Sequence, residues 1–546
     1  MCITTNRQFA DRGASVIARS IRDRFAVPPP LLLAGHPDAV KLELKPYLQP
    51  FERELAMREL KALLEPGDSL TEEHGIWLAH TSVSDEFLRE RLTYWQRAGR
   101  SQLEPTLQKS LEFTQNGSAQ VAERGELHRA RRLRYGPHDL HEYRGKFFPQ
   151  LVRSLINISG VPEGALVLDP MCGSGTTPCE AVASGCAALG ADLNPLSVLI
   201  AGVKAAVPAL DPADFYKNAH GRLEKFKFPS IDPAIVWGES DLRYLGMWFD
   251  PVAISDLASI VSEIGKIRLP IYRDLFRVFL SNIVRSVSWQ KATDLRVRKE
   301  VLPYIPGSAH ERFLAEARSQ IDRIHPYLSI LRLKRPANVE IRRGNAVNVA
   351  SIFPERRGTV DLLVTSPPYA TALPYLDTDR LSLIVLGLLS RKSHGEAERD
   401  MVGTREVSER ERREAWAAYE GRRGELPAEI SELIDRIAAV NHGEGVGFRR
   451  RNLPALLGKY FLSMLDAMRS ARDLMKPGAF GYYVVGNNST ELDGEKVEIP
   501  TDRFLFDLGA AAGWTPIEKI PMELIVSRDI FRENRGSSET ILCFQA

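Results

Sequence analysis

The sequence predicts an α/β protein built on a doubly wound, Rossmann-like parallel sheet, and three stretches of the chain carry this prediction. The apolar run ALVLD (165–169) ends in an acidic residue and is followed by a Gly-rich turn and a helical stretch over 176–184. A second run, AALGAD (187–192), also ends in Asp, and DLLVTSPPY (361–369) again joins an apolar run to a turn. Strand, loop, helix and strand in this order form the repeating unit of an open sheet with helices on both faces.

Other segments complete this sheet or interrupt it. VEIRRGNA (339–346) resumes the strand pattern, 454–476 predicts a helix, and AFGYYVVG (479–486) and ETILCFQA (539–546) follow it. We therefore expect one parallel-sheet domain with helical insertions and an N-terminal helical region. The expected parts are an N-terminal helical accessory region at 1–135, the sheet domain at 136–204, 339–388 and 452–546, a helical insertion at 205–338 and a charged insertion at 389–451.

The N-terminal region is expected to be helical because two of its segments have an amphipathic pattern. PFERELAMRELKALL (50–64) and SDEFLRERLTYWQR (84–97) place apolar residues at helical spacing, and Ser84 is a suitable N-cap for the second. The basic segment RARRLRY (129–135) is expected to be a linker or a phosphate contact.

Length and composition exclude several classes of protein. With 546 residues the chain has room for about three domains, and 44% hydrophobic and 26% charged residues are ordinary for a globular protein. The net charge of +2 means that any contact with nucleic acid must come from local basic patches. Five sparse cysteines predict neither a disulfide framework nor a metal site. Without a signal peptide or an 18-residue apolar run, we expect a cytoplasmic protein with no membrane contact.

The Gly-rich turn at 169–176, Asp-Pro-Met-Cys-Gly-Ser-Gly-Thr, is the first candidate binding element. Glycines let the backbone approach a ligand closely, and the N–H groups at the start of a helix can meet an anionic group. A phosphate-binding loop would have Lys after its last Gly, where this chain has Thr176. A dinucleotide fingerprint would have a third Gly or Ala where this chain has Pro178. Both phosphate hypotheses are therefore weakened.

Asp192 supplies the second half of this candidate site, because it ends the next predicted strand. An acidic side chain there can accept hydrogen bonds from both ribose hydroxyls of a nucleoside. A methionine-like tail at the Gly-rich turn and a ribose at Asp192 suit S-adenosylmethionine. The alternative is a strand–turn–helix unit of purely structural importance, since Gly-rich turns also occur without a ligand.

Ser366-Pro367-Pro368-Tyr369 is the candidate catalytic element. Two consecutive prolines fix two φ angles and hold the Ser366 hydroxyl and the Pro367 carbonyl at the end of a strand. A base flipped out of a duplex could stack on Tyr369 while its amino hydrogens meet those two oxygens. These acceptors would expose the lone pair of the amino nitrogen to a methyl group. A surface Pro-Pro loop is the competing interpretation, and the nearby Gly-rich turn weakens it.

DPMCGSGT (169–176), ALGADLN (188–194) and TSPPY (365–369), in this order, resemble the amino-methylating DNA methyltransferases. The resemblance implies the Rossmann-like fold of class I S-adenosylmethionine methyltransferases, with this cofactor, and catalysis by Ser366, Pro367, Pro368 and Tyr369. HEYRGKFFPQLV (141–152) is similar to the family's segment over the methionine end of the cofactor. The implied cofactor-binding residues are Asp169, Pro170, Cys172, Gly173, Gly175, Thr176, Asp192, Leu193, Asn345 and Phe148. Lys146, Phe147 and Pro149 are further candidates on the cofactor side.

The resemblance also bears on the product. Family members with Ser before Pro-Pro usually modify cytosine N4, so cytosine N4 is the favoured target, and those with Asp or Asn usually modify adenine N6. Asn345 departs from the family pattern, in which an acidic residue often follows this strand, although an amide oxygen can still bond the adenine amino group. Adenine-N6 methylation, guanine methylation of tRNA and a non-catalytic subunit of a modification or defence complex remain alternatives. The intact Gly173 and Ser366 argue against the last of these.

The resemblance implies double-stranded DNA as the partner, and it allows a cognate restriction or defence protein as a second partner. Three regions of the chain are candidates for binding the DNA. Residues 273–299 predict an amphipathic helix followed by a basic tail. The part at 285–299 carries a net charge of +4 with Trp289 interleaved, a pattern typical of phosphate binding beside an aromatic platform. A core helix with solvated arginines is the alternative. In this segment the candidate DNA-binding residues are Arg285, Lys291, Arg296 and Arg298. The charges of 389–451 balance, apart from Arg449–Arg451, which predicts a solvated, mobile segment, and residues 1–135 are the third region.

Overall fold

The central sheet of the computed structural model has seven strands, and their order defines the fold. Its strands are β6 (Leu166–Asp169), β7 (Ala187–Asp192), β8 (Val339–Arg343), β9 (Val360–Thr365), β10 (Met475–Gly486), β13 (Thr515–Met522) and β14 (Glu539–Gln545). They lie in the order β13-β14-β10-β9-β6-β7-β8, and β14 is antiparallel to both of its neighbours while β6 to β10 are parallel. The structure describes residues 39–112, 133–143, 148–291, 298–333, 338–370, 375–403, 407–441, 446–492, 494–522 and 539–546. The predicted Rossmann-like fold is confirmed.

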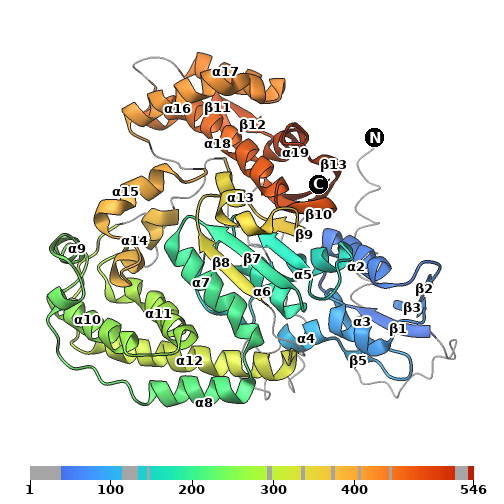
Figure 1. Cartoon of the computed structure of the whole chain (residues 1–546), viewed down its shortest axis with the longest axis horizontal. Helices are drawn as coiled ribbons and strands as arrows, with labels where there is room; N and C mark the ends of the chain where they lie inside the picture. The colour runs from blue at the N-terminus through green and yellow to red at the C-terminus, as the bar shows by residue number, and fades with distance from the viewer. Residues whose placement is uncertain are drawn as a thin grey trace, which may run out of the picture.

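Helices cover both faces of this sheet, as Figure 1 shows. Alternate strand residues point to opposite faces. Leu168 and Leu363 pack with α18 (Phe448–Arg472) and α19 (Thr501–Ala511) in one buried cluster. Val167 and Leu362 belong to the cluster on the other side, with α5 (Pro149–Ile158) and α6 (Thr176–Ala183). The apolar runs of the sequence are thus buried on both sides, as a parallel sheet requires.

The strand order reverses beside β6, and this reversal locates a binding crevice. The chain passes from β6 through α6 to β7, and then through α7 (Pro195–Ala206) and the helical insertion to β8. It returns to the other side of β6 with β9 and continues to β10. In open parallel sheets, ligands bind outside the carboxyl ends of the strands where the order reverses. The crevice is therefore expected between the loops that follow β6 and β9.

The N-terminal region contains a sheet, which corrects the expectation of an all-helical region. Its five strands, ordered β2-β3-β1-β4-β5, are antiparallel. They are β1 (Ala39–Leu44), β2 (Ser69–Glu73), β3 (Ile76–His80), β4 (Trp95–Gly99) and β5 (Glu104–Pro105). The predicted helix at 50–64 is confirmed as α2 (Pro50–Leu63), and α4 spans Leu107–Glu112. The helix predicted at 84–97 is shorter, α3 (Asp85–Arg91), because Trp95 begins a strand instead; Ser84 does cap it, accepting the N–H of Phe87.

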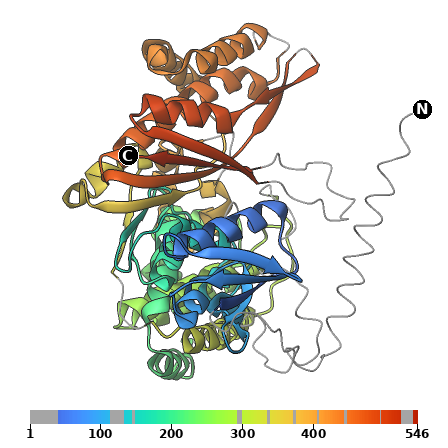
Figure 2. The same cartoon turned by 90° about the vertical axis from the view of Figure 1, so that its right-hand side faces the viewer.

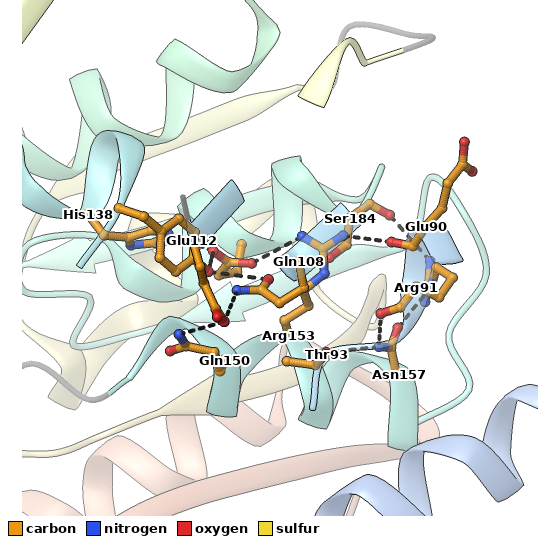
Figure 3. Close-up of polar contacts among 12 residues, drawn as sticks. Glu90, Arg91, Thr93, Gln108, Glu112, His138, Gln150, Arg153, Asn157 and Ser184 are labelled. Carbon is orange, nitrogen blue, oxygen red and sulfur yellow. Dashed lines mark hydrogen bonds and ion pairs between the residues drawn. The ribbon is translucent and has the colours of Figure 1, made fainter. Parts of the chain in front are cut away.

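Buried polar contacts join this region to α5, as Figure 3 shows. Arg91 Nε donates to Asn157 Oδ1 over 2.8 Å, and Asn157 Nδ2 donates to Glu59 Oε1 over 2.6 Å. Gln150 Nε2 donates to Glu112 Oε1 over 3.2 Å. An unpaired polar group at such a buried interface would cost about 1–3 kcal/mol, so these bonds select one docking geometry. The accessory region is thereby fixed to the helix that precedes β6 (Figure 2).

Figure 1 shows the first insertion at the lower left and residues 409–440 of the second insertion at the top, while residues 391–399 of the second insertion lie between them and contact the first. The first forms α8 (Pro212–Leu223), α9 (Glu239–Leu245), α10 (Pro251–Gly265), α11 (Pro270–Val284) and α12 (Ser308–Leu331), and α14 (Tyr375–Val385) contributes to the same buried cluster. The second forms α15 (Arg391–Arg399), α16 (Glu409–Arg422) and α17 (Ala428–Val440), and a two-stranded hairpin, β11 (Asn488–Leu492) and β12 (Glu495–Ile499), follows α18.

The second insertion is more ordered than its balanced charge predicted. Tyr419, Ile430 and Ile434 are fully buried in the cluster formed with α18. Several of its arginines pair with acids, either on the same helix, as in the 2.7 Å contact of Arg410 with Glu414, or on another element, as in the 2.7 Å contact of Arg422 with Asp466 of α18. Balanced charge here marks the outer faces of amphipathic helices, which the expectation of a solvated, mobile segment overlooked. Among the described residues, no helix is long and apolar enough to cross a membrane.

Candidate functional site

A cavity of about 1100 Å³, counting the solvent at its mouth, lies at the carboxyl ends of the strands around the reversal point. The segments after β6, β7, β8 and β9 all contribute to its walls. The lining residues are Tyr143, Phe148, Pro170, Met171, Gly173, Asp192, Leu193, Asn194, Gly344, Asn345, Ala346, Ser366, Pro367, Pro368, Tyr369, Met401, Val402 and Glu539. The Gly-rich turn and the Ser-Pro-Pro-Tyr element, far apart in the sequence, therefore face one space.

Gly173 and Gly175 of the turn each require glycine, for different structural reasons. Gly175 has a φ of +79°, and a Cβ there would lie 2.6 Å from the Cα of Ala201 on α7. Gly173 has a φ of +48°, and a Cβ there would lie 3.1 Å from the ring of Tyr143 in the cavity wall. Only glycine adopts these conformations at low cost. Gly175 thus lets α6 and α7 pack, and Gly173 keeps the backbone open toward the cavity.

Asp192 lies at the end of β7 and organises the turn. Its Oδ2 accepts the N–H of Gly173 over 2.9 Å, and its Oδ1 accepts the N–H of Asn194 over 2.8 Å. Burial raises the pKa of Asp192 to about 6, although these two hydrogen bonds oppose the rise. A carboxylate has about four acceptor sites, so two remain for ligand hydroxyls. The carboxylate faces the cavity, where it can accept such bonds.

Four of the predicted cofactor residues do not line the cavity: Asp169, Cys172, Gly175 and Thr176. Asp169 is buried and accepts the hydroxyl of Thr365 over 2.7 Å and the N–H of Met171 over 3.1 Å. Burial raises its pKa to about 7. The contact with Thr365 joins the end of β6 to the end of β9, so Asp169 holds the two candidate elements together. Pro170, Gly173, Asp192, Leu193, Asn345 and Phe148 do line the cavity. Lys146 and Phe147 lie outside the described residues, and Pro149 begins α5.

The Ser-Pro-Pro-Tyr element and the strand before it accept hydrogen bonds from side chains of α18 and α6. The Tyr460 hydroxyl of α18 donates to the Pro368 carbonyl over 3.0 Å, and the Tyr460 side chain is buried. Thr177 Oγ1 donates to the carbonyl of Val364, in the strand that leads into the element, over 3.1 Å. Pro367 is buried while Ser366 is half-buried at the cavity wall. The loop therefore presents Ser366 and Tyr369 from a rigid base.

Tyr460→Phe is expected to lower turnover about three- to tenfold and leave cofactor affinity unchanged. The change removes the donor to a buried carbonyl, which costs about 1–3 kcal/mol and loosens the loop that carries Ser366. Steady-state kinetics and calorimetric titration of the cofactor measure the two effects. Tyr419→Phe, a buried tyrosine of α16, is the control for a general loss of stability. Equal losses in both variants would contradict a specific role of Tyr460.

Asn345 is engaged within the protein. Its Oδ1 accepts the N–H of Val347 over 3.2 Å, capping a short helical turn, and its Nδ2 donates to the carbonyl of Asp400 over 2.7 Å. The side chain thus links the end of β8 to the second insertion. An amide oxygen accepts two hydrogen bonds, so the predicted adenine contact would use the second of them.

The structure adds cavity residues that sequence patterns did not single out. These are Tyr143, Met171, Asn194, Gly344, Ala346, Met401, Val402 and Glu539. Tyr143 lies in the segment 141–152 that was already assigned to the cofactor side, and its hydroxyl lies 3.1 Å from Ser197 Oγ. Met401 and Val402 come from the second insertion, and Glu539 begins β14. Met171 and Asn194 stand inside the motifs at 169–176 and 188–194. Long-range packing brings in Met401, Val402 and Glu539, which no local motif marks.

The candidate DNA-binding residues that the structure describes, Arg285, Lys291 and Arg298, do not line the cavity. Arg285 donates to the Lys291 carbonyl over 3.0 Å, and the Lys299 ammonium lies 4.8 Å from the centre of the Trp289 ring. Lys291 and Arg298 are exposed, whereas Arg296 lies outside the described residues. The aromatic and basic side chains do interleave at the end of α11, but Arg285 and Lys299 already have partners within the protein.

No group of His, Cys, Asp or Glu in the described part of the chain has the arrangement of a metal site. His138 is buried against Glu180, with 2.6 Å between His138 Nε2 and Glu180 Oε1, and His141 Nε2 lies 2.9 Å from Ser281 Oγ. Both histidines serve packing between elements. The polar side chains that line the cavity are those of Asp192, Glu539, Ser366 and two tyrosines, together with the amides of Asn194 and Asn345.

Residues 140–193 match the UPF0020 family model, described as an RMKL-like methyltransferase domain. The chain is 20% identical over 387 residues to the type II methyltransferase M.MvaI of Kocuria varians, covering 68% of this chain and 80% of that protein. It is 26% identical over 280 residues to the type II methyltransferase M.BsoBI of Geobacillus stearothermophilus, covering 47% and 53% of the two chains.

A shorter match is to a tRNA (guanine(10)-N2)-dimethyltransferase of Methanothermobacter thermautotrophicus, with 42% identity over 52 residues, 10% of this chain and 16% of that protein. These matches agree with the fold, and the family model covers β6 and β7 with the Gly-rich turn between them. The comparisons therefore show a chain that is similar to type II DNA methyltransferases and that contains a match to a methyltransferase domain, which implies S-adenosylmethionine as the methyl donor.

Proposed function

We propose that the protein transfers a methyl group to the exocyclic amine of a base flipped out of double-stranded DNA, with cytosine N4 as the favoured target. The observation that carries the proposal is that one cavity is lined by both Asp192 and Ser366–Tyr369. A cofactor site and an amine-recognition element must share a space for direct methyl transfer, because the reacting atoms must approach to about 3–3.5 Å.

The residues at the turn fit the cofactor. The Asp192 carboxylate would accept the ribose hydroxyls, and the backbone at Gly173 would lie along the methionine portion because no Cβ obstructs it. Phe148 and Leu193 would supply apolar contacts. Bound there, S-adenosylmethionine supplies an electrophilic methyl group on a sulfonium.

The Ser-Pro-Pro-Tyr element would recognise the amine. Ser366 Oγ and the Pro367 carbonyl would accept its two hydrogens, and the ring of Tyr369 would stack on the base. These bonds strengthen as the nitrogen becomes tetrahedral, so they lower the barrier more than they aid binding. Ser366 and Pro367 would hold the amine with its lone pair toward the methyl group that the sulfonium supplies, and after the transfer the nitrogen would lose its proton to solvent. No strong base is required at the site.

The long matches to type II methyltransferases favour DNA over RNA as substrate, since the tRNA enzyme matches 52 residues alone. Serine before Pro-Pro favours cytosine N4 over adenine N6. On the basis of the matches to type II methyltransferases, we also propose a cognate restriction or defence protein as the partner of this protein.

Incubation with methyl-labelled S-adenosylmethionine and either unmodified duplex DNA or bulk tRNA tests the substrate class. Label that enters DNA and is released by DNase supports the proposal. Label that enters tRNA alone would contradict it and favour the RNA alternative. Ser366→Ala, which alters the proposed amine contact, is the matched control in both reactions.

The basic segment 285–299 is the proposed DNA contact outside the cavity. Arg296→Glu with Arg298→Glu is expected to weaken binding to all sequences alike and to reduce the salt dependence by roughly one unit of slope for each phosphate that is no longer bound. Fluorescence anisotropy over a salt series measures this. Arg243→Glu serves as the control, since Arg243 is exposed in the same insertion and pairs with Glu239. An unchanged slope would turn attention to Arg449–Arg451 at the start of α18.

A further inference from the structure

Tyr369 is held at a second point, opposite the prolines. Its hydroxyl donates to Glu539 Oε1 over 2.6 Å, and both side chains line the cavity. Glu539 is the first residue of β14, and 170 positions separate it from Tyr369 in the chain. A hydrogen bond to a carboxylate is about twice as strong as one between neutral groups. The bond therefore ties the hydroxyl end of the ring to the first residue of β14 in the central sheet.

The backbone beneath the ring is shaped to receive it. Gly486 ends β10 and pairs directly with Glu539 in the antiparallel β10–β14 ladder. A Cβ at Gly486 would lie 3.0 Å from Tyr369 Cζ and 3.1 Å from its hydroxyl oxygen. The ring thus lies against a bare stretch of strand, and the adjacent strand supplies the acceptor for its hydroxyl.

We propose that Glu539 is a positioning residue that, together with Gly486, sets the plane of the Tyr369 ring for stacking on the target base. The inference rests on the proposed function, in which Tyr369 captures a flipped base. An exposed aromatic side chain that pivots must be ordered when the base arrives, at a cost in conformational entropy. A ring fixed in advance at its hydroxyl and its face binds without that cost.

Four variants separate this role from general structural support. Glu539→Ala and Tyr369→Phe each remove the same bond, so each is expected to raise the KM for DNA about three- to tenfold, with the Kd for S-adenosylmethionine unchanged. The double variant should be no worse than either single one. Glu539→Gln keeps an acceptor oxygen and should restore most of the affinity. Gly486→Ala should raise the KM because its methyl group displaces the ring. Glu495→Ala, an exposed carboxylate of β12, is the control.

Fluorine NMR tests the contact without relying on activity. With 3-fluorotyrosine at position 369 of the full-length protein, the resonance should shift clearly in Glu539→Ala and much less in Glu539→Gln. Additive KM effects in the double variant, or an unshifted resonance, would overturn the positioning role even if the protein methylates DNA. A wild-type protein that transfers no methyl group to DNA would instead refute the proposed function. The positioning of a base would then fail with it, whatever the resonance shows of the contact.

Discussion

Ser366→Ala is expected to lower turnover by about a hundredfold or more, while S-adenosylmethionine binds nearly as tightly as to the wild type. The hydroxyl lies directly after β9 on a loop fixed by two prolines and by the Tyr460 hydroxyl, so it is already in place when the amine arrives. Removing one preorganised group that bonds the transition state typically costs about 10²–10³ in rate. Single-turnover rates with labelled cofactor measure the chemical step, and calorimetry measures cofactor affinity.

Ser366→Thr provides the matched comparison, because it keeps an acceptor oxygen at the same place. Partial activity in the threonine variant beside an inactive alanine variant would assign the effect to the hydroxyl. An alanine variant with wild-type turnover would show that Ser366 does not bond the amine. Loss of cofactor affinity in parallel with turnover would indicate instead that the loop had moved.

Asp192→Ala is expected to weaken S-adenosylmethionine binding by about a hundredfold or more. Two charge-assisted bonds to the ribose would be lost, each worth roughly 1.5–3 kcal/mol. The structure adds a second cause, since the same carboxylate holds the N–H groups of Gly173 and Asn194. Calorimetric titration of a variant whose circular dichroism matches the wild type measures the change. Unaltered affinity would remove Asp192 from the cofactor site.

The raised pKa of Asp192 predicts that the affinity for S-adenosylmethionine depends on pH. Because burial raises the pKa of Asp192 to about 6, the group is ionised above that pH and becomes protonated below it. Protonation removes the charge that strengthens the ribose bonds, so the Kd for the cofactor should rise as the pH falls through about 6 and level off above about pH 7. Asp192→Asn has no such ionisation and should show a flat profile over this range.

The sequence predicted the parts of the molecule whose determinants are local. ALVLD and AALGAD are apolar runs that parallel strands bury on both faces, and AALGAD ends in Asp192, which lines the crevice. The two prolines at 367–368 fix their backbone whatever surrounds them. Consequently the sheet and two walls of the cavity could be expected from residue types and spacing alone.

The features that were not predicted depend on contacts between residues that are far apart in the sequence. In β1 the buried Val40 and Leu42 alternate over only six residues, and β5 has two, so the small N-terminal sheet leaves little periodicity to detect. Glu539 acquires its place beside Tyr369 through the β10–β14 pairing. Asp169 was expected to contact the cofactor, yet it lies buried against Thr365, because the strand ends converge there. Such contacts are properties of the assembled sheet.

Mass spectrometry of nucleosides decides whether this cavity methylates cytosine in DNA. Duplex DNA from a host that lacks modified bases is treated with the protein and methyl-labelled S-adenosylmethionine, digested and compared with a reaction containing the Ser366→Ala variant. We predict labelled N4-methylcytosine that depends on Ser366. Labelled N6-methyladenine would keep the amine chemistry but contradict the assignment of the base. DNA that carries no label, beside labelled RNA in a parallel reaction, would contradict the claim that this cavity methylates DNA.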